Sequence, residues 1–287
     1  MSKTKIFLEG IVWGEGLRWH DDRLWLSDIY GKKVLRAGMD GCAETACEVP
    51  AMPSGLGFLP DGRLLIVAGD GKVLRQDGDT LTEVADLCKL AVASNDMVVD
   101  KRGNAYIGSY GYDIRTYKGG PAEGWITLVK PDGEMTVAGR GMMCPNGLVV
   151  TPDGKTLIAA DTLAKQLVAY TIEEDGSLSE RHVWAEMTAG PDGIGLDAEG
   201  AVWAATPHAG EVVRVQEGGK VLARVPCQDT PLCCALGGPE RKTLFIVTVP
   251  VGNDLTAEEM NDLDSAASKA GSKVHVLAVD VAGAGCP

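Results

Sequence analysis

The chain has 287 residues, of which 40 are acidic and 27 are basic, so its formal net charge is −13 at pH 7. This charge disfavours binding to the phosphate backbone of nucleic acids and to anionic membrane surfaces. With 45% apolar residues and 37 glycines, the composition is typical of a globular protein with a large core and many turns.

The N-terminal sequence MSKTKIFLEG has no apolar stretch of signal-peptide length, and no run of about 18 apolar residues follows it. We therefore expect a cytoplasmic protein with neither a membrane nor a nucleic acid as its partner. The eight cysteines have no zinc-ligand spacing, so we expect most of them to be small buried hydrophobic residues. Cys42 and Cys47 could pair in an oxidising environment, whereas the adjacent Cys233 and Cys234 could not easily bridge each other.

Six related segments follow one another along the chain, at residues 16–41, 55–80, 95–111, 146–177, 192–219 and 234–250. Each contains a short apolar run, a turn rich in Gly, Asp or Pro, and a second apolar run, which is the pattern of a β-hairpin. They recur roughly every 40 to 50 residues, the period of one propeller blade. We predict one all-β domain over residues 1–287, a six-bladed β-propeller with four antiparallel strands per blade. Five or seven blades are the alternatives.

The end of the chain completes this ring. The segment 255–270, LTAEEMNDLDSAASKA, has a helical or loop-like pattern, and we place it between strands of the sixth blade. We expect the last strand, KVHVLAVDV, to pair with the N-terminal KTKIFLEG, because closing the ring removes its exposed strand edges.

Four of the repeats share a glycine in the first turn, which Arg23 replaces in the first repeat and Arg241 approximately replaces in the sixth. Aligning the repeats on this position places one residue of each at an equivalent position, just before the innermost strand. Equivalent positions of all blades converge on the axis of a propeller. The six residues are Glu15, Ser54, Asn95, Asn146, Asp192 and Cys233. Single Asn-Gly and Asp-Gly pairs are ordinary turn sequences, but four oxygen-bearing ligands at one register predict a metal site.

Two carboxylates and two amide oxygens form a hard donor set. This set suits Ca²⁺ and, less closely, Mg²⁺ or Mn²⁺, whereas Zn²⁺, the remaining alternative, usually recruits His or Cys. Four protein ligands would leave positions free for water or substrate, as a catalytic metal requires. The sequence contains neither a GxSxG nucleophile elbow nor a GxxxxGK[ST] phosphate loop. Serine hydrolase and nucleotidase functions are therefore disfavoured.

Four segments, GEGLRWHDDRLWLSDI, ASNDMVVDKRGNAYIGS, CPNGLVVTPDGKTLIAAD and GPDGIGLDAEGAVWAA, resemble the regucalcin/gluconolactonase (senescence marker protein) family of six-bladed propeller lactonases. More distantly they resemble diisopropyl fluorophosphatase. The resemblance implies a metal held by Glu15, Asn146 and Asp192, with Asn95 reaching the metal or holding the substrate. It also implies hydrolysis of lactones, or of phosphoester-type bonds in some relatives.

One departure bears on the substrate. Sugar-lactone members of the family often carry Arg two residues before the third-blade Asn, where this chain has Ala93. We therefore expect a less polar lactone or ester as the small-molecule substrate. Further candidates for substrate contact are Tyr110, Tyr112, Met142, Met143 and His208, although packing between blades is the alternative for each.

The expected reaction is hydrolysis of a cyclic ester, in which the metal polarises the carbonyl group and water is the nucleophile. Asp192 is the first candidate for the general base, because the resemblance implies that role for the fifth-blade carboxylate, and Asp96 is the second. Two other functions remain open, a phosphotriesterase-like hydrolase on the same metal site and a metal-binding scaffold without catalysis. The oligomeric state is also open.

Overall fold

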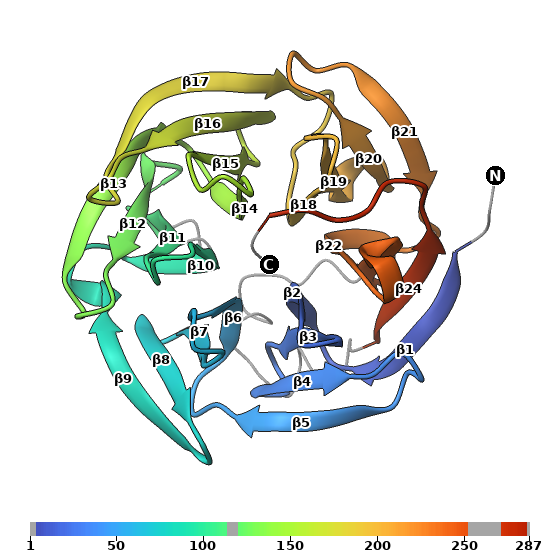
Figure 1. The fold of residues 1–287 in the computed structure, drawn as a ribbon, viewed down its shortest axis with the longest axis horizontal. Helices are drawn as coiled ribbons and strands as arrows, with labels where there is room; N and C mark the ends of the chain where they lie inside the picture. Colours follow the sequence, from blue (N-terminus) through green and yellow to red (C-terminus); the bar gives the residue numbers. More distant parts are fainter. Residues whose placement is uncertain (1–3, 114–119, 252–270, 286–287) are drawn as a thin grey trace.

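The computed structural model describes residues 4–113, 120–251 and 271–285 and confirms the six-bladed propeller. Six sheets of four antiparallel strands form a ring around a central channel axis, and one edge strand of each sheet lies nearest that axis (Figure 1). The only helices in the described residues are three single-turn 3₁₀ helices, η1 (Leu87–Lys89), η2 (Pro207–Ala209) and η3 (Pro239–Arg241). The expected helical or loop-like segment 255–270 lies outside the described residues.

From the channel outward, the strands of blades one to three are β2 (Gly14–His20), β3 (Arg23–Asp28), β4 (Lys33–Ala37) and β5 (Ala43–Glu48); β6 (Pro53–Phe58), β7 (Leu64–Ala68), β8 (Lys72–Asp77) and β9 (Thr80–Asp86); and β10 (Ala93–Val99), β11 (Ala105–Tyr110), β12 (Gly124–Val129) and β13 (Met135–Met142). Those of blades four to six are β14 (Pro145–Val150), β15 (Thr156–Asp161), β16 (Gln166–Ile172) and β17 (Leu178–Glu186); β18 (Ile194–Leu196), β19 (Val202–Thr206), β20 (Glu211–Val215) and β21 (Val221–Pro226); and β22 (Thr230–Gly237), β23 (Thr243–Val249), β24 (Ser272–Ala278) and β1 (Lys5–Ile11).

The ring closes as predicted, because β1 supplies the outermost strand of blade six. It pairs antiparallel with β24, with Lys5 opposite Val276 and Ile6 opposite His275. The first and last strands of the chain are therefore held in one sheet. After β24 the chain turns inward beside the end of β18, where the Ala284 amide donates to the Leu196 carbonyl at 2.8 Å. Figure 1 shows the last of the described residues near the middle of the ring.

The hairpin turns explain the glycine on which the repeats align. In blades two to five this glycine adopts the left-handed conformation that side chains disfavour, with φ of 85°, 85°, 72° and 77° at Gly62, Gly103, Gly154 and Gly200. Blade one uses Asp21 and Asp22 instead, with φ of 48° and 57°. Aspartate tolerates this region better than most residues, so the hairpin forms without glycine.

The core lies between neighbouring blades. One hydrophobic cluster, for example, joins Tyr106 and Ile126 of blade three to Leu148 and Leu157 of blade four. Each blade thus buries its faces against two neighbours, which fixes the inner strands around the channel. None of the helices in the described residues is long and apolar enough to cross a membrane.

Candidate metal centre

The six aligned residues lie at the channel-side beginning of the inner strands. Glu15, Ser54 and Asn146 are the second residues of their strands and Asn95 is the third, whereas Asp192 lies two residues before its strand. Cys233 is the fourth residue of β22. The expected position before the strand is therefore wrong for all but Asp192, since the inner strands begin earlier than the apolar runs of the sequence.

The pairing of inner and second strands is irregular at this level. The register shifts between Glu15 and Arg18 in blade one, between Ser94 and Met97 in blade three, and between Pro145 and Leu148 in blade four. Such bulges re-aim a side chain that regular alternation would direct elsewhere. They allow side chains from separate blades to meet beside the channel.

Glycines directly after four of the aligned residues allow the inner strands to approach each other closely. A Cβ at Gly147 would lie 2.6 Å from the Ile194 nitrogen, and a Cβ at Gly193 would collide with the side chain of Cys233. Similar collisions would occur at Gly16 and Gly55. The Asn-Gly and Asp-Gly pairs therefore serve close packing between blades rather than a turn.

Side-chain hydrogen bonds connect blades three and four. Asn95 Nδ2 donates to Asn146 Oδ1 at 3.2 Å, and Asn146 Nδ2 donates to Thr162 Oγ1 at 3.4 Å. The Thr162 hydroxyl in turn donates to the Pro191 carbonyl at 2.7 Å, next to Asp192. The structure thus brings Asn95, Asn146 and Thr162 into one network, of which sequence reasoning missed Thr162.

Two acidic side chains from blades one and five influence each other. Burial, together with the negative charge of Asp96, raises the pKa of Glu15 to about 7. Burial also raises the pKa of Asp192 well above its ordinary value, and the charges of Glu15 and Asp96 add to that rise. A hydrogen bond with Asn146 opposes the shift in Asp192. A bound cation would stabilise carboxylates that are desolvated and repel each other. The carboxylate and amide oxygens gathered here are suitable ligands for such a cation.

The remaining two aligned residues contribute less. The Ser54 hydroxyl donates to the backbone carbonyl of Asn95 at 3.0 Å, so it supports the neighbouring strand. The Cys233 thiol is hydrogen-bonded with Glu15, and burial raises its pKa well above the ordinary range. A protonated thiol is a poor metal ligand. Across the described residues, no three His, Cys, Asp or Glu side chains alone form a metal-binding group. Any ion here must therefore also use the amide oxygens.

Asp96, the second candidate base, forms a salt bridge with the buried guanidinium group of Arg18. Its Oδ1 lies 2.6 Å from Nη2 of Arg18 and accepts the Met97 amide at 2.9 Å. These bonds favour a structural role for Asp96 and leave Asp192 as the stronger candidate base. Sequence reasoning missed Arg18. Its charge was a usable signal, because the equivalent residue in every other blade is small or apolar.

The candidates for substrate contact divide into two groups. Tyr110, Tyr112 and Met142 are at most 1% exposed. The two tyrosine rings contact each other edge to face, and Tyr110 donates to the Pro145 carbonyl at 2.6 Å while hydrogen-bonding with Asn95. Met142 packs in the hydrophobic cluster between blades three and four.

Met143 and His208 form the second group. Both are exposed, and His208 belongs to η2. Substrate contact by any of these residues stays a prediction. Tyr110 has the most direct link to the metal candidates, through Asn95.

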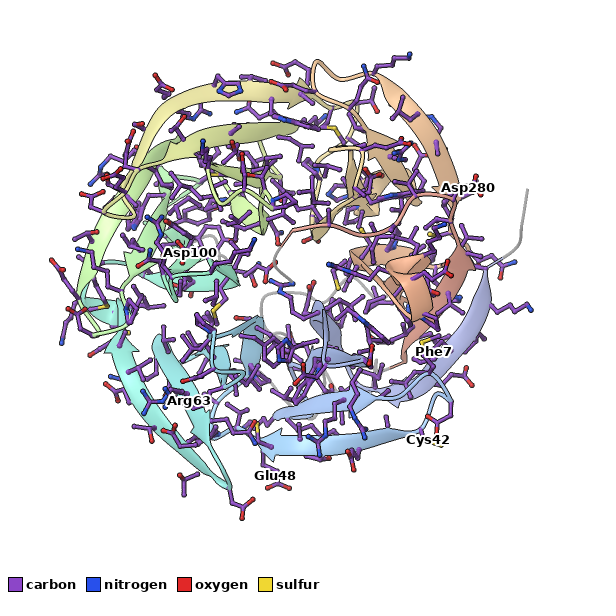
Figure 2. All side chains as sticks on the ribbon, viewed as in Figure 1. Phe7, Cys42, Glu48, Arg63, Asp100 and Asp280 are labelled. Atoms are coloured by element: carbon purple, nitrogen blue, oxygen red, sulfur yellow. The ribbon has the colours of Figure 1, made fainter. Side chains whose placement is uncertain are left out.

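Cys42 and Cys47 are both free thiols, which excludes the disulfide left open by the sequence. The strand β5 separates them, and an extended strand cannot bring its two ends together. In Figure 2, the labelled Cys42 and Glu48 mark opposite ends of this outer strand.

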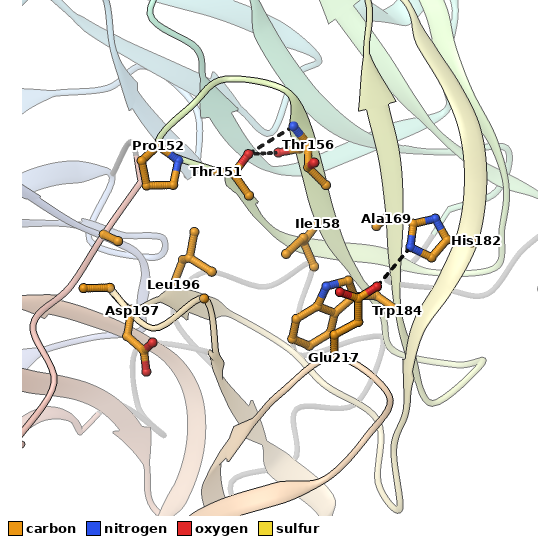
Figure 3. A pocket seen from close by; sticks show the side chains of 13 residues that line it. Thr151, Pro152, Thr156, Ile158, Ala169, His182, Trp184, Leu196, Asp197 and Glu217 are labelled. Atoms are coloured by element: carbon orange, nitrogen blue, oxygen red, sulfur yellow. Dashed lines mark hydrogen bonds and ion pairs between the residues drawn. The ribbon is translucent and has the colours of Figure 1, made fainter.

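Two sizeable cavities lie away from the aligned residues. One of about 450 Å³ lies between blades four and five, beside the hairpin turns at the far ends of β14 and β18 (Figure 3). Ile158 and Trp184 form part of its wall, and His182 pairs with Glu217 at 3.6 Å on its rim. The other, of about 1190 Å³, lies along the outer strands of blades five and six. Neither is lined by an aligned residue.

Comparison with known proteins is consistent with the resemblance seen in the sequence. The chain is 29% identical to pentonolactonase XacC of Haloferax volcanii over 296 residues, covering 100% of this chain and 97% of that protein. It is 26% identical to regucalcin of Xenopus laevis over 264 residues, covering 88% and 87%. The fold is similar to that of a calcium-binding protein, regucalcin, from Agrobacterium tumefaciens, with a TM-score of 0.79, 24% identity and coverage of 100% and 97%.

The family assignment rests on the match between the sequence and a family model. The model describes the SMP-30/Gluconolactonase/LRE-like region and matches residues 13–250. This span begins just before β2 and ends just after β23, so it includes all six inner strands. The chain therefore belongs to the SMP-30/gluconolactonase/LRE-like family.

Proposed function

We propose that the protein is a metal-dependent lactonase, which adds water to a cyclic ester and releases a hydroxy acid. The observation that carries this proposal is the convergence of oxygen-bearing side chains from four blades: Asn95 donates to Asn146, Asn146 hydrogen-bonds with Asp192, and the charge of Glu15 raises the pKa of Asp192. Membership of the SMP-30/gluconolactonase/LRE-like family and similarity to proteins named pentonolactonase and 6-deoxy-6-sulfogluconolactonase support a lactone as the substrate.

In this proposal, Glu15, Asn146 and Asp192 hold one divalent ion, and Asn95 assists as a ligand or through its hydrogen bond to Asn146. Hard oxygen donors fit Ca²⁺ best, with Mg²⁺ and Mn²⁺ as alternatives. When bound, such an ion polarises the ester carbonyl and offsets the negative charge of the tetrahedral intermediate.

The protein residues manage the proton. A carboxylate oxygen of Asp192 accepts a proton from the attacking water while the water oxygen bonds to the carbonyl carbon. When the ring C–O bond breaks, Asp192 returns this proton to the alcohol oxygen. Water and lactone are thus converted to hydroxy acid, and Asp192 is regenerated.

A lactone assay with metal exchange tests the proposal. The protein is treated with a chelator, dialysed and supplied with Ca²⁺, and acid release is titrated for aliphatic, aromatic and sugar lactones at each stage. We expect turnover to disappear on chelation and to return with Ca²⁺. Metal binding without turnover of any lactone would instead support a scaffold, and turnover of a phosphotriester alone would support the phosphotriesterase alternative.

A further inference from the structure

Arg18 carries a charge at a position where the other blades have none. It lies three residues after Glu15 in β2 and is only 6% exposed. The equivalent residues of the other blades are Gly57, Val98, Val149, Gly195 and Leu236. Burying a charged side chain is costly unless it is paired and hydrogen-bonded. Its presence therefore calls for a specific partner.

That partner lies in blade three, beyond the adjacent blade two. Nη2 of Arg18 contacts Asp96 Oδ1 at 2.6 Å and also donates to the Met97 carbonyl, while Nη1 donates to the Leu17 carbonyl at 2.7 Å. The inner strands β2 and β10 both border the channel, with β6 between them (Figure 1). Arg18 thus connects two strands that share no backbone ladder.

The connected segment lacks part of its own ladder. The register of β10 against β11 shifts between Ser94 and Met97, and Asn95 and Asp96 lie within this gap. From blade two, the Ser54 hydroxyl holds the Asn95 carbonyl at 3.0 Å. From blade one, Arg18 holds the next two residues. The segment is therefore positioned by side chains of other blades where its own sheet does not hold it.

We propose that Arg18 is a positioning residue that holds Asn95 in place through Asp96 and the Met97 carbonyl. The proposal rests on the proposed function, since it assigns Asn95 to the metal centre. Groups that orient metal ligands from outside the coordination sphere typically change metal affinity by about 10- to 100-fold when they are replaced. Loss of the Arg18 contacts is expected to have an effect of this size.

A charge-balanced double variant, Arg18→Met/Asp96→Asn, separates position from charge. Removing one positive and one negative charge leaves the total charge near the metal unchanged, and no unpaired buried carboxylate remains. We expect a folded protein with a melting temperature near that of the wild type and a Ca²⁺ affinity at least about 10-fold lower by calorimetric titration. If Arg18 served only to neutralise Asp96, the double variant would instead keep the Ca²⁺ affinity and the kcat of the wild type along with its stability.

A matched control exists in blade five. Arg214 Nε lies 2.6 Å from Asp197 Oδ2, and both side chains are largely buried away from the aligned residues. Arg214→Met/Asp197→Asn should leave the Ca²⁺ affinity unchanged, even if the melting temperature falls.

Arg18→Lys provides a second measurement, which also decides the question if the double variant does not fold. The lysine keeps the charge but offers only one nitrogen in place of the guanidinium fork. We expect its Ca²⁺ affinity to fall several-fold. Wild-type affinity in the double variant, or in Arg18→Lys if the double variant does not fold, overturns the positioning role. Failure of the wild type to bind Ca²⁺ would overturn the proposed function instead.

Discussion

Asn95 Nδ2 donates a hydrogen bond of 3.2 Å to Asn146 Oδ1, joining residues 51 positions apart in the sequence. Because Asn146 Nδ2 also donates to Thr162, the Asn146 amide is held at both ends, and its oxygen has a defined direction. Asn95 therefore orients Asn146 as well as being a possible ligand. This geometry predicts unequal roles for the two asparagines, which replacing each in turn would distinguish.

We expect Asn146→Ala to remove the bound ion almost completely and Asn95→Ala to weaken binding by about 10- to 100-fold. The alanine at 146 removes a ligand, whereas the alanine at 95 removes mainly its orientation. Elemental analysis after extensive dialysis, followed by calorimetric titration with Ca²⁺, measures both. The control is Asn104→Ala, which removes a buried hydrogen bond to Asp100 at 2.9 Å in another part of blade three. Full metal content in Asn146→Ala would exclude it as a ligand.

The close approach of the inner strands predicts opposite results at two glycines of blade five. A Cβ at Gly193 would collide with Cys233, but the nearest atom to a Cβ at Gly195 is 3.5 Å away, an ordinary contact. Gly193→Ala should therefore destabilise the protein by about 1–3 kcal/mol or more through overpacking. Gly195→Ala should be neutral or stabilising by up to about 1 kcal/mol, since alanine reduces the entropy of the unfolded chain. Chemical denaturation of both variants tests this contrast, and equal losses would refute it.

Most of the fold was predictable because a propeller repeats itself. The glycine of the first hairpin and the apolar runs on either side were sufficient to align the blades and to predict ring closure through KTKIFLEG. The start of each inner strand was not predictable, since the bulge near Asn146 depends on contacts with neighbouring strands. Backbone pairing of this kind leaves no periodic signal in one sequence.

The acidic residues of the candidate site were predictable from the sequence, but the residues that hydrogen-bond to its asparagines were not. Glu15 and Asp192 share one register, so repeat alignment alone brings them together. Thr162 lies on a connection whose sequence resembles any polar loop. Tyr110 occupies a strand end where its exposure depends on how blade four packs against blade three. Side-chain burial between blades is a property of two repeats together, so a single repeat cannot reveal it.

The apolar side chain at position 93 leads to a prediction about the substrate. It packs beside the apolar cluster of Tyr110, Tyr112 and Cys144, without the arginine that sugar-lactone members often carry. The methyl group of Ala93 cannot form a hydrogen bond, so a substrate hydroxyl placed beside it would lose hydrogen bonds to water without replacement. We expect kcat/KM to be higher for an apolar γ- or δ-lactone than for gluconolactone, and Ala93→Arg to reduce this preference. A higher kcat/KM for gluconolactone in the wild type would reverse the prediction.

The raised pKa of Glu15 makes the effect of calcium on stability depend on pH. A carboxyl group whose folded-state pKa is raised from its ordinary value to about 7 stabilises the fold below about pH 4.5, and that stability is lost as pH rises through 7. In the metal-free protein this loss is on the order of 3 kcal/mol. Bound Ca²⁺ offsets it, so the rise in melting temperature on adding Ca²⁺ should be larger at pH 8 than at pH 5.5. Thermal unfolding of Glu15→Gln, which cannot titrate, should show a smaller difference between the two pH values, and an equal difference would assign the effect elsewhere.

Asp192 distinguishes an enzyme from a metal-binding scaffold. Asparagine has nearly the same size and keeps one oxygen that can bind a metal, but it cannot accept the proton of the attacking water. Loss of a positioned general base typically costs about 10²- to 10⁴-fold in rate, whereas loss of one ligand charge weakens mainly metal affinity. We therefore expect Asp192→Asn at saturating Ca²⁺ to remain folded and metal-loaded while kcat falls at least about 100-fold.

Glu15→Gln is the matched variant for this prediction. It also replaces a buried carboxylate with an amide of the same size, but the proposal gives Glu15 no part in proton transfer. Its activity should recover substantially as Ca²⁺ is raised, so the two variants should diverge at high metal concentration. Steady-state kinetics over a Ca²⁺ series, with metal content measured in parallel, compares them directly. Recovery of Asp192→Asn to near wild-type kcat would show that the base is elsewhere. Asp96 would then be the next residue to test, although Arg18 and the Met97 amide already engage its Oδ1.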